Sequence, residues 1–333
     1  MTQPKFPSGY RLGIVNPLTL VGNEIKTILR ERAFPFERVM LLDSTGQQTG
    51  ALTEIGDEAA IVTAVSDDEL EDLDLVFFCG VPAVNREWIE RHREDNFIAI
   101  DLSRPTAADS GKLAVAGVNL DELSSDSRLI VSPHPIAIPL ALVLHRVETL
   151  SPIEICTATV VQPASEFGQI GIEELAAQSI SVLNVAPMPK EVFDRQLAFN
   201  LYPAPERNEE LVIDQVHQLT DLDSELALLI TQGTIFHGHT FSIFVKTRDP
   251  LNVVDINNRL RDDTAIALPD VDESFGTIDA AGKDQVLVAE VRGDPAIRGG
   301  FWIWAVCDNL RRSSALNAVL IAEEVLLGSG QVH

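Results

Sequence analysis

Cysteine is scarce in this chain, and its few thiols are not paired. Cys79, Cys156 and Cys307 lie far apart, each within an apolar run. They lack the paired spacing that is typical of a zinc site or of a disulfide framework. This pattern favours three buried thiols, and we expect no bound metal.

Positive charge is also scarce. The 50 Asp and Glu residues outnumber the 25 Lys and Arg residues and give a net charge of −25, so the surface would repel a phosphate polymer or an anionic membrane. No apolar run approaches the roughly 20 residues that cross a bilayer, and no charged-then-apolar signal opens the chain. We expect a soluble protein of the reducing cytoplasm that binds neither nucleic acid nor membrane.

The first part of the chain alternates strands and helices. An apolar content of 45% in 333 residues suffices for a large core, and typical domains of about 100–200 residues predict two of them. Hydrophobic runs predict strands at residues 10–15, 38–43, 75–79, 97–101 and 113–118, and helices at residues 22–32 and 84–93. Such alternation is typical of a parallel, helix-covered sheet, which binds ligands where its strands end.

The loop between the first strand and the first helix, residues 16–22, lies where a dinucleotide-binding protein has three glycines. Only Gly22 is present. Pro17 lacks a backbone N–H, and Leu18 is bulky where the backbone should approach a pyrophosphate, which favours a structural turn. Asp43, about twenty positions further on, is either a ribose ligand or an ordinary turn residue at a strand end.

The second part follows a different pattern. It predicts β-rich runs at 152–162 and 225–248, strands at 285–291 and 300–307, and helices at 170–183, 209–219 and 252–262. This order fits an α+β domain with a mixed or antiparallel sheet. A final apolar helix at 311–327 ends at Gly328, and the residues alone leave open which domain it joins.

The stretch 129–139 connects the two patterns. A buried strand breaks into a turn held by two prolines, which opens an apolar helix at 136–150. Many enzymes hold a catalytic nucleophile on such a strand-to-helix turn, but Pro135 stands where a thiol or hydroxyl would be most useful. Ser132 and His134 would need a new geometry to act as the nucleophile.

Polar candidates elsewhere are few. They are Gln162, Ser165, His237, His239 and the segment 308–311. His237 and His239 flank Gly238, which either continues a strand or marks a turn. A two-histidine metal site would need at least one more ligand, which no local spacing supplies. Two interpretations stay open, a catalytic histidine and a histidine hydrogen-bonded at a sheet end.

Several segments resemble the aspartate-semialdehyde dehydrogenase family. They are Phe199-Asn200, Gly238-His239, residues 279–283, residues 308–323, and residues 172–175 followed by Gln178, and the resemblance extends from about residue 10 to residue 327. It implies an α/β fold with a Rossmann-like NAD(P)-binding domain, residues 1–133, completed by residues 311–333. Residues 134–310 would form an α+β catalytic and dimerisation domain. The family's enzymes are homodimers of amino-acid biosynthesis that reduce aspartyl phosphate with NADPH through a cysteine thioester.

Carried over by position, the resemblance assigns roles to four residues. Gln162 orients the substrate, His239 is the acid/base group, Asn309 lies near the nicotinamide, and Gly22 is the remaining glycine of the cofactor loop. Pro135 fills the position of the nucleophilic cysteine. A proline cannot form a thioester.

Charged groups that the family uses are also replaced. Gln232 stands in place of the arginine that clamps the substrate carboxylate, and Val212 in place of the lysine near the phosphate. Gly46 or a neighbour replaces the basic residue for the cofactor 2′-phosphate. The family also has an arginine after the strand that ends at residues 101–103. This chain lacks it at that position, although Arg104 is close and could substitute. A neutral amide cannot imitate a bidentate guanidinium.

The chain is similar in this respect to the usg-type paralogues, which lack the catalytic cysteine. We therefore expect a cytoplasmic homodimer that keeps the fold, has lost the family reaction, and acts by binding a small anionic metabolite or a protein partner. NADP is the cofactor that the resemblance implies, and the altered loop argues against it. The competing interpretation is an active NADP-dependent aspartate-semialdehyde dehydrogenase or a related oxidoreductase.

Overall fold

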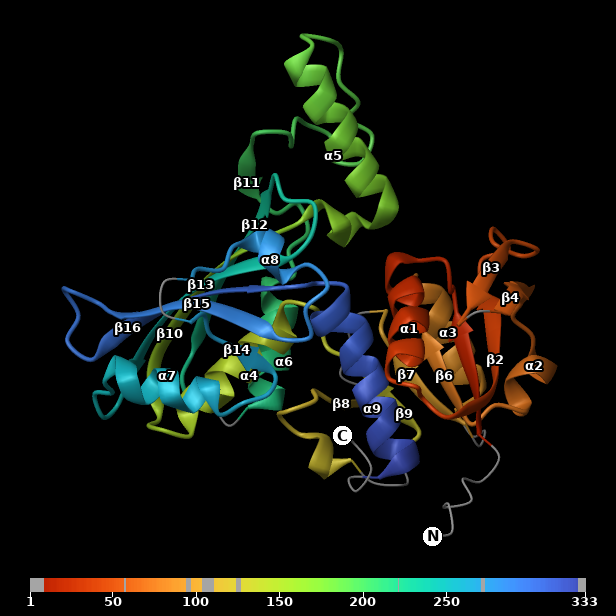
Figure 1. Cartoon of the computed structure of the whole chain (residues 1–333), viewed down its shortest axis with the longest axis horizontal. Coiled ribbons are helices and arrows are strands. Elements are labelled where there is room, and N and C mark those ends of the chain that lie inside the picture. Colours follow the sequence, from red (N-terminus) through yellow and green to blue (C-terminus); the bar gives the residue numbers. More distant parts are fainter. Residues whose placement is uncertain are drawn as a thin grey trace. The chain divides into compact units, whose positions relative to one another are not determined.

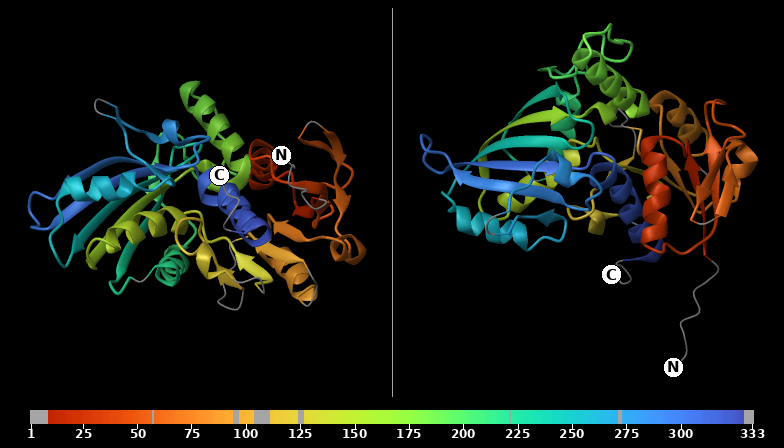
Figure 2. Two further views of the ribbon diagram at one scale, coloured as in Figure 1. Left: turned by 60° about the horizontal axis from the view of Figure 1, so that its bottom comes forward. Right: turned by 45° about the horizontal axis from the view of Figure 1, so that its top comes forward.

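Two units divide the described chain. The computed structural model describes residues 9–56, 58–93, 97–103, 111–123, 127–220, 222–270 and 273–328. Met1–Pro133 and Ser314–His333 form the first unit, and His134–Ser313 form the second. Figures 1 and 2 show the elements of both. Of the helices in the described ranges, none has the length and apolar character needed to cross a membrane.

A seven-stranded sheet is the centre of the first unit. Its strand order is β5-β2-β1-β6-β7-β9-β8, and all pairings in it are parallel. The strands are β1 (Tyr10–Val15), β2 (Phe36–Asp43), β5 (Thr63–Ala64), β6 (Leu75–Phe78), β7 (Ile98–Asp101), β8 (Lys112–Leu113) and β9 (Leu129–Val131). The Rossmann-like prediction for this part of the chain is confirmed.

Helices cover both faces of this sheet, and its central strand β6 is accordingly apolar and buried at every position. Leu75 and Phe77 of β6 belong to a core with α1 (Leu20–Glu31) and α9 (Leu316–Leu327). Val76 and Phe78 belong to a second core with α2 (Asp67–Glu71) and α3 (Pro82–Arg91). The unit also contains a short hairpin, β3 (Leu52–Ile55) and β4 (Glu58–Ile61), and a 3-10 turn, η1 (Leu120–Glu122).

The predicted strand at 113–118 is wrong beyond its first residue, because β8 ends at Leu113. Side-chain amides accept hydrogen bonds from backbone N–H groups of the residues that follow. Asn119 Oδ1 accepts from the N–H of Val115 (2.9 Å), and Asn317 Oδ1 accepts from the N–H of Ala116 (2.9 Å). Residues 114–116 are buried. The N–H of Ala114 still donates to the carbonyl oxygen of Val131 in β9 (3.1 Å), but the next two N–H groups are paired with side-chain amides and not with a strand.

The second unit contains a mixed sheet of seven strands in the order β11-β12-β10-β13-β16-β15-β14. The strands are β10 (Ile153–Gln162), β11 (Leu201–Pro203), β12 (Leu226–Gly233), β13 (His239–Thr247), β14 (Ile266–Ala267), β15 (Val286–Gly293) and β16 (Gly300–Cys307). The pairs β10–β12 and β14–β15 are parallel and the others antiparallel. The mixed sheet confirms the α+β prediction.

Helices cover one face of the mixed sheet, and the short helix α8 (Thr277–Ala280) packs on part of the other, called the open face here, next to Val306 of β16. Those on the covered face are α4 (Ala137–Glu148), α6 (Glu209–Leu219) and α7 (Val253–Arg261), as Figure 1 shows. Along β10, Cys156, Ala158 and Val160 are buried, whereas Thr157 and Thr159 between them are exposed. This period of two places the exposed side chains on the open face.

The structure defines two predicted elements of the second part more closely. The β-rich region at 225–248 is two strands, β12 and β13, because the chain turns at residues 234–238, where Gly238 has a φ of +85°. Of the two interpretations of Gly238, the turn is the one observed. The helix predicted at 311–327 begins with a π-helical turn, η3 (Arg311–Ala315), and only then becomes α9. Short elements in this unit are η2 (Ala164–Phe167) and α8 (Thr277–Ala280).

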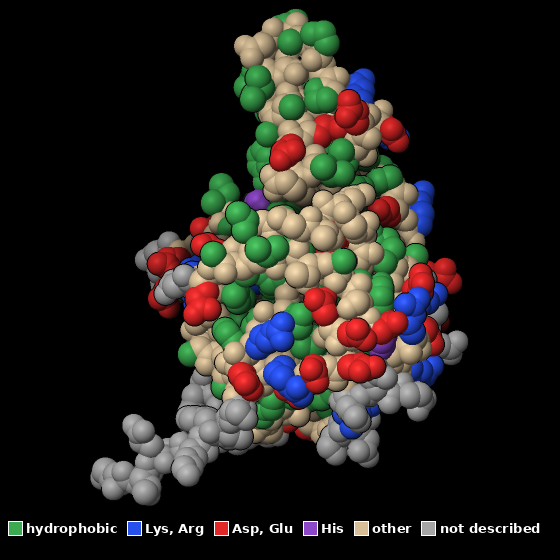
Figure 3. Space-filling view, turned by 90° about the vertical axis from the view of Figure 1, so that its right-hand side faces the viewer, with side chains coloured by type: hydrophobic (Ala, Val, Ile, Leu, Met, Phe, Trp, Pro, Cys, Tyr) green, Lys and Arg blue, Asp and Glu red, His purple; other side chains and the backbone are tan. Residues whose placement is uncertain are grey.

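Helix α5 (Gly168–Leu183) projects from the second unit with the loop that follows it (Figures 1 and 3). Its surface is partly apolar, since Leu183 is 74% exposed and Val185 is 95% exposed. The carboxylate of Glu174 accepts from three successive backbone N–H groups, residues 191–193, at 2.7–3.1 Å. The amide of Gln178 bonds to residues 189–198 of the same loop. Two side chains therefore fasten the loop to the helix.

We predict that Glu174→Ala lowers the free energy of unfolding by about 2–3 kcal/mol, because three backbone N–H groups, one buried and two partly buried, lose their carboxylate acceptor. The adjacent Glu173→Ala is the matched control. Glu173 is exposed and bonds only to Gln169 in the same helix, so its loss should change stability by less than about 0.5 kcal/mol. Urea unfolding measures both, and amide exchange at residues 191–193 should accelerate only in Glu174→Ala. Equal effects in the two variants would contradict the fastening role.

Candidate functional site

The central turn is fixed by hydrogen bonds on both sides of Pro135. The N–H of His134 donates to Oε1 of Gln215 (2.7 Å), and the N–H of Ile136 donates to Nδ1 of His134 (3.1 Å). Residues 131–140 are all buried. Nδ1 of His134 therefore accepts a hydrogen bond within the turn, and Pro135 contributes no reactive atom.

Ser132 is engaged in the same way in the first unit. Its N–H donates to the carbonyl oxygen of Asp101 (2.9 Å), and its Oγ accepts from Nδ2 of Asn317 (3.1 Å). No basic side chain among these partners would activate the hydroxyl. The structure assigns Ser132 to holding the strand end.

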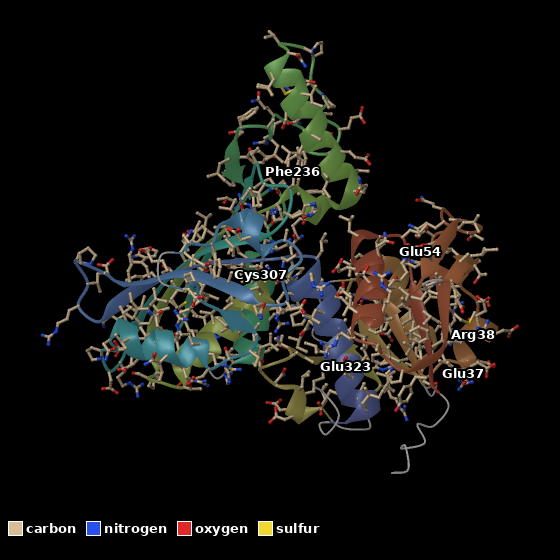
Figure 4. All side chains as sticks on the ribbon, viewed as in Figure 1. Glu37, Arg38, Glu54, Phe236, Cys307 and Glu323 are labelled. Atoms are coloured by element: carbon tan, nitrogen blue, oxygen red, sulfur yellow. The ribbon has the colours of Figure 1, made fainter. Side chains whose placement is uncertain are left out.

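The three cysteines are buried, as expected, and none is in the turn. Cys79 follows β6 and Cys156 lies within β10. Cys307, labelled in Figure 4, ends β16. Burial raises the pKa of Cys79, and it raises the pKa of Cys156 and Cys307 to about 12, the hydrogen bond between Cys307 and Ser313 offsetting only part of the effect. Neutral buried thiols are poor nucleophiles.

Gln162 and Gln232 form a closed amide pair. They are register partners at the ends of the parallel strands β10 and β12, and both are buried. Nε2 of Gln162 donates to Oε1 of Gln232 (2.9 Å), and Nε2 of Gln232 donates to the carbonyl oxygen of Gln162 (3.2 Å). Gln162, which the resemblance predicts to orient the substrate, is thus bonded to Gln232, which stands where the resemblance predicts the arginine for the substrate carboxylate.

His239 belongs to a buried cluster that the sequence only partly predicted. Nε2 of His239, the first residue of β13, lies 3.3 Å from Oε1 of Glu166 in η2. Nδ2 of Asn309 donates to the same oxygen (3.1 Å), and Oδ1 of Asn309 accepts from Oγ of Ser165 (3.1 Å) and the N–H of Gly238 (3.0 Å). The structure therefore brings together His239, Asn309 and Ser165, which were candidates, and Glu166, which was not.

Glu166 gave no sequence signal beyond its position next to Ser165, since a single acidic residue after a strand is common. His237 is not part of the cluster. It lies half-buried in the turn before β13, because Gly238 interrupts the strand. Across the described ranges, no group of three His, Cys, Asp or Glu side chains could hold a metal ion.

Asn16 fills the edge of the parallel sheet in the first unit. It has a left-handed backbone (φ +58°), which asparagine tolerates better than most residues. Its Nδ2 donates to the carbonyl oxygen of Cys79 (2.7 Å), and its Oδ1 accepts from the N–H of Ser44 (3.1 Å). One side chain thus ties together the C-terminal ends of β1, β2 and β6, where a dinucleotide would bind.

Gly22 keeps a packing role at the same edge. A Cβ there would lie 2.7 Å from the carbonyl oxygen of Asn16 and 2.8 Å from Cα of Pro17, so only glycine lets α1 approach the loop this closely. The N-terminus of α1 is already capped, because Oγ1 of Thr19 accepts from the N–H of Gly22 (3.0 Å). Helix–loop packing explains the glycine without a ligand.

Asp43 is a turn residue with its carboxylate fully engaged. Oδ1 accepts from the N–H and hydroxyl of Thr45 (2.9 and 2.8 Å). Oδ2 accepts from the N–H of Gln48 (2.6 Å) and from the N–H and hydroxyl of Thr49 (2.7 and 3.0 Å). Burial alone would raise the pKa of Asp43, but these hydrogen bonds outweigh it and lower the pKa to about 2. Of the two interpretations of Asp43, the structure selects the structural one.

Comparison with known proteins identifies the family. Residues 12–132 match the model of the semialdehyde dehydrogenase NAD binding domain, and residues 147–312 match that of the semialdehyde dehydrogenase dimerisation domain. The chain belongs to the semialdehyde dehydrogenase family.

Relatives narrow this to aspartate-semialdehyde dehydrogenases. The Rickettsia conorii enzyme of that name is 26% identical, with 95% of this chain and 98% of the relative covered. The USG-1 protein homolog of Pseudomonas aeruginosa is 29% identical over 97% and 98%. The structure of a probable aspartate-semialdehyde dehydrogenase from Pseudomonas aeruginosa matches with a TM-score of 0.90 and 27% identity over 97% and 100%.

At the positions where the resemblance predicts charged side chains, this chain has an apolar residue, a neutral residue, or a residue outside the described ranges. Val212 is a fully buried core residue of α6, so a lysine at this position would have to bury its ammonium group. The loop at residues 44–50, which includes Gly46, contains no lysine or arginine. Arg104 lies outside the described residues. At these described positions the chain therefore has no basic side chain.

The nucleotide-binding half of this family member does not fit a dinucleotide at its adenosine end. Both carboxylate oxygens of Asp43 are used by the chain's own donors, and the residues after it offer a 2′-phosphate no cation. Pro17 has no N–H for a pyrophosphate. No hydride-transfer step is therefore derived through NADP.

We predict that Asp43→Asn lowers the free energy of unfolding by about 2 kcal/mol at neutral pH, the equivalent of its depressed pKa. Because the folded pKa is below the unfolded value, this stabilisation is complete above about pH 5 and is lost as the pH falls toward 2. Urea unfolding between these values should show the difference from wild type narrowing on acidification. The exposed Asp68→Asn should stay within about 0.5 kcal/mol throughout, and a pH-independent deficit in Asp43→Asn would contradict a charged role.

Proposed function

We propose that this chain is a non-catalytic member of the aspartate-semialdehyde dehydrogenase family that acts by binding. The observation that carries the proposal is Pro135, buried in the turn where the family's reaction needs a thiolate. His134 and Ser132 beside it are engaged in holding that turn, and the three thiols are neutral and buried elsewhere. The covalent step of acyl transfer therefore has no nucleophile.

The remnant site supports this proposal because its polar side chains bond to one another. The NH₂ group of Gln162 bonds to Gln232. Oε1 of Glu166 is shared by His239 and Asn309. A substrate would have to break these buried contacts before forming its own, and each would cost about 1–3 kcal/mol to leave unmade. The site is arranged to be stable without a substrate.

The competing function is an active dehydrogenase or a related oxidoreductase of amino-acid biosynthesis, and its cofactor would be NADP. One observation favours that rival, namely the contact of His239 with a carboxylate, an arrangement that acid–base enzymes use to orient an imidazole. The missing nucleophile and the engaged Asp43 weigh against it. Binding of a small anionic metabolite or of a protein partner replaces catalysis in the proposal, as the sequence suggested.

A homodimer is the second part of the proposal. Residues 147–312 match a dimerisation domain, and the mixed sheet in this range has an open face. Ile155 of β10 and Leu229 of β12 are about half exposed on it, at 46% and 48%, and Thr159 of β10 is the register partner of Leu229. Exposed apolar groups on a flat sheet are typical of an interface between subunits.

We predict that the purified protein shows no phosphate-dependent oxidation of aspartate semialdehyde with NADP or NAD, followed by the absorbance of the reduced cofactor. Pro135→Cys alone should not restore activity, because Gln232, Val212 and the cofactor loop are unchanged. A cysteine-containing relative assayed in parallel is the positive control.

Two outcomes would count against this prediction. Turnover by wild type that disappears in His239→Ala would establish the rival function. Oxidation by Pro135→Cys alone would show that the remaining site is intact. Neither dinucleotide, at about 1 mM, should raise the melting temperature, since only a ligand of the native state stabilises it.

We predict that Ile155→Glu weakens the dimer by roughly a hundredfold or more, because a buried unpaired carboxylate costs several kcal/mol. Light scattering after size-exclusion chromatography measures the mass. Ile61→Glu is the matched control, because Ile61 is 58% exposed on β4 of the first unit, and this variant should stay dimeric. If both variants remain dimers at low micromolar concentration, the open sheet face is not the interface.

A further inference from the structure

An apolar stripe runs along the outside of the arm that α5 forms with the loop after it, residues 168–200. Ile172, Ala176, Ile180 and Leu183 follow one another at intervals of three or four residues, which places them on one face of the helix. Ile180 is 62% exposed and Leu183 is 74% exposed. A helix that faces only solvent normally carries polar side chains there.

This part of the arm is also uncharged. Residues 175–189 contain no Asp, Glu, Lys or Arg, although these residue types make up 23% of the chain. Figure 3 shows apolar side chains at the far end of the arm. Because each chain carries a net charge of −25, two copies repel each other across most of their surfaces. An uncharged surface lets a second copy approach without burying like charges.

The end of α5 holds a valine in a backbone conformation that suits glycine. The N–H of Val185 donates to the carbonyl oxygen of Val182 (3.2 Å), and the N–H of Ala186 donates to that of Ser181 (2.9 Å). These are the hydrogen bonds of a helix end that usually has glycine in the left-handed position. Val185 has a φ of +54°, which strains a β-branched residue.

Packing within the chain does not offset this strain, because Val185 is 95% exposed. A contact with another molecule would bury its side chain and give the valine an advantage over glycine.

The arm is preformed, because its inner side has a small core of its own. Leu175 and Val182 of α5 pack with Phe193 and Leu197 of the loop. The rings of Phe167 and Phe193 meet edge to face, with centroids 5.1 Å apart. The hydrogen bonds that fasten the loop to α5 add to this rigidity. A preformed surface loses less entropy on binding.

The loop connects the arm to the open face of the mixed sheet. It leads into the edge strand β11, where Leu201 is 59% exposed and is the register partner of Gly233 in β12. Gly233 lies four residues after Leu229, so both are on the same face of β12. Register partners share a face, which places Leu201 on the open face with Leu229. The arm therefore begins at the edge of the face proposed for dimerisation.

We propose that the arm docks against a second copy of this chain, with Ile180, Leu183 and Val185 in the contact, and so extends the interface made by the open sheet face. The inference rests on the homodimer proposed above. A second copy fits the arm because the apolar stripe is uncharged, because the loop leads to the open face, and because the whole arm lies within residues 147–312, which match a dimerisation domain.

Sedimentation velocity over a concentration series measures the dimer Kd of the full chain. Leu183→Glu should weaken the dimer about tenfold or more, because an unpaired carboxylate would be buried in the contact. Val254→Glu is the matched control, since Val254 is 66% exposed on α7 of the same unit. This variant should leave the Kd unchanged.

A second variant guards against an effect on folding. Val185→Gly places the usual residue at the helix end and should therefore keep the arm folded. It should still weaken the dimer about fivefold or more, because the valine side chain is lost from the contact.

Equal Kd values for wild type, Leu183→Glu and Val185→Gly would overturn the docking of the arm. The open face is tested separately by Ile155→Glu. If Ile155→Glu dissociates the dimer and both arm variants leave it intact, only the arm contact is wrong. A wild type that stays monomeric throughout the series would instead contradict the proposed homodimer, and the arm contact with it.

Discussion

The requirement that buried polar groups be paired governs the functional regions of this protein. A ligand site normally leaves some of its polar side chains for the ligand. Here the chain pairs them itself: Gln162 with Gln232, His239 with Glu166, and Asp43 with the donors of its own loop. Once these contacts exist, binding a substrate or a ribose would first require breaking them. These contacts and the proline at position 135 therefore both support the proposed non-catalytic role.

Architecture and reactivity are separable in this fold because they depend on different residues. The parallel sheet and the mixed sheet are held by apolar runs that no reaction requires. The central turn keeps its geometry through the backbone N–H groups of His134 and Ile136, and neither bond needs a cysteine at position 135. A proline there is compatible with the turn, because the residue's N–H is not among those hydrogen bonds. The fold can thus be kept when a residue that the reaction needs is replaced.

The elements that sequence reasoning predicted well are those with long, uninterrupted hydrophobic patterns. The run at 114–118 was predicted as strand because burial alone was visible, whereas Asn119 and Asn317 decide how its backbone is paired. Glu166 was missed for a related reason, since its partners His239 and Asn309 lie 73 and 143 positions further along the chain. No local pattern reports contacts over such separations.

The sequence by itself determined the two-part α/β and α+β organisation, the absence of a nucleophile at Pro135 and the family resemblance, because each depends on residue type and local order. Only the tertiary structure decided that Asp43 is a turn residue and that Gln162 is bonded to Gln232. Those facts depend on which distant groups meet in space. Hydrogen bonding and burial, which set what a polar side chain can do, are properties of that arrangement and not of the order of residues.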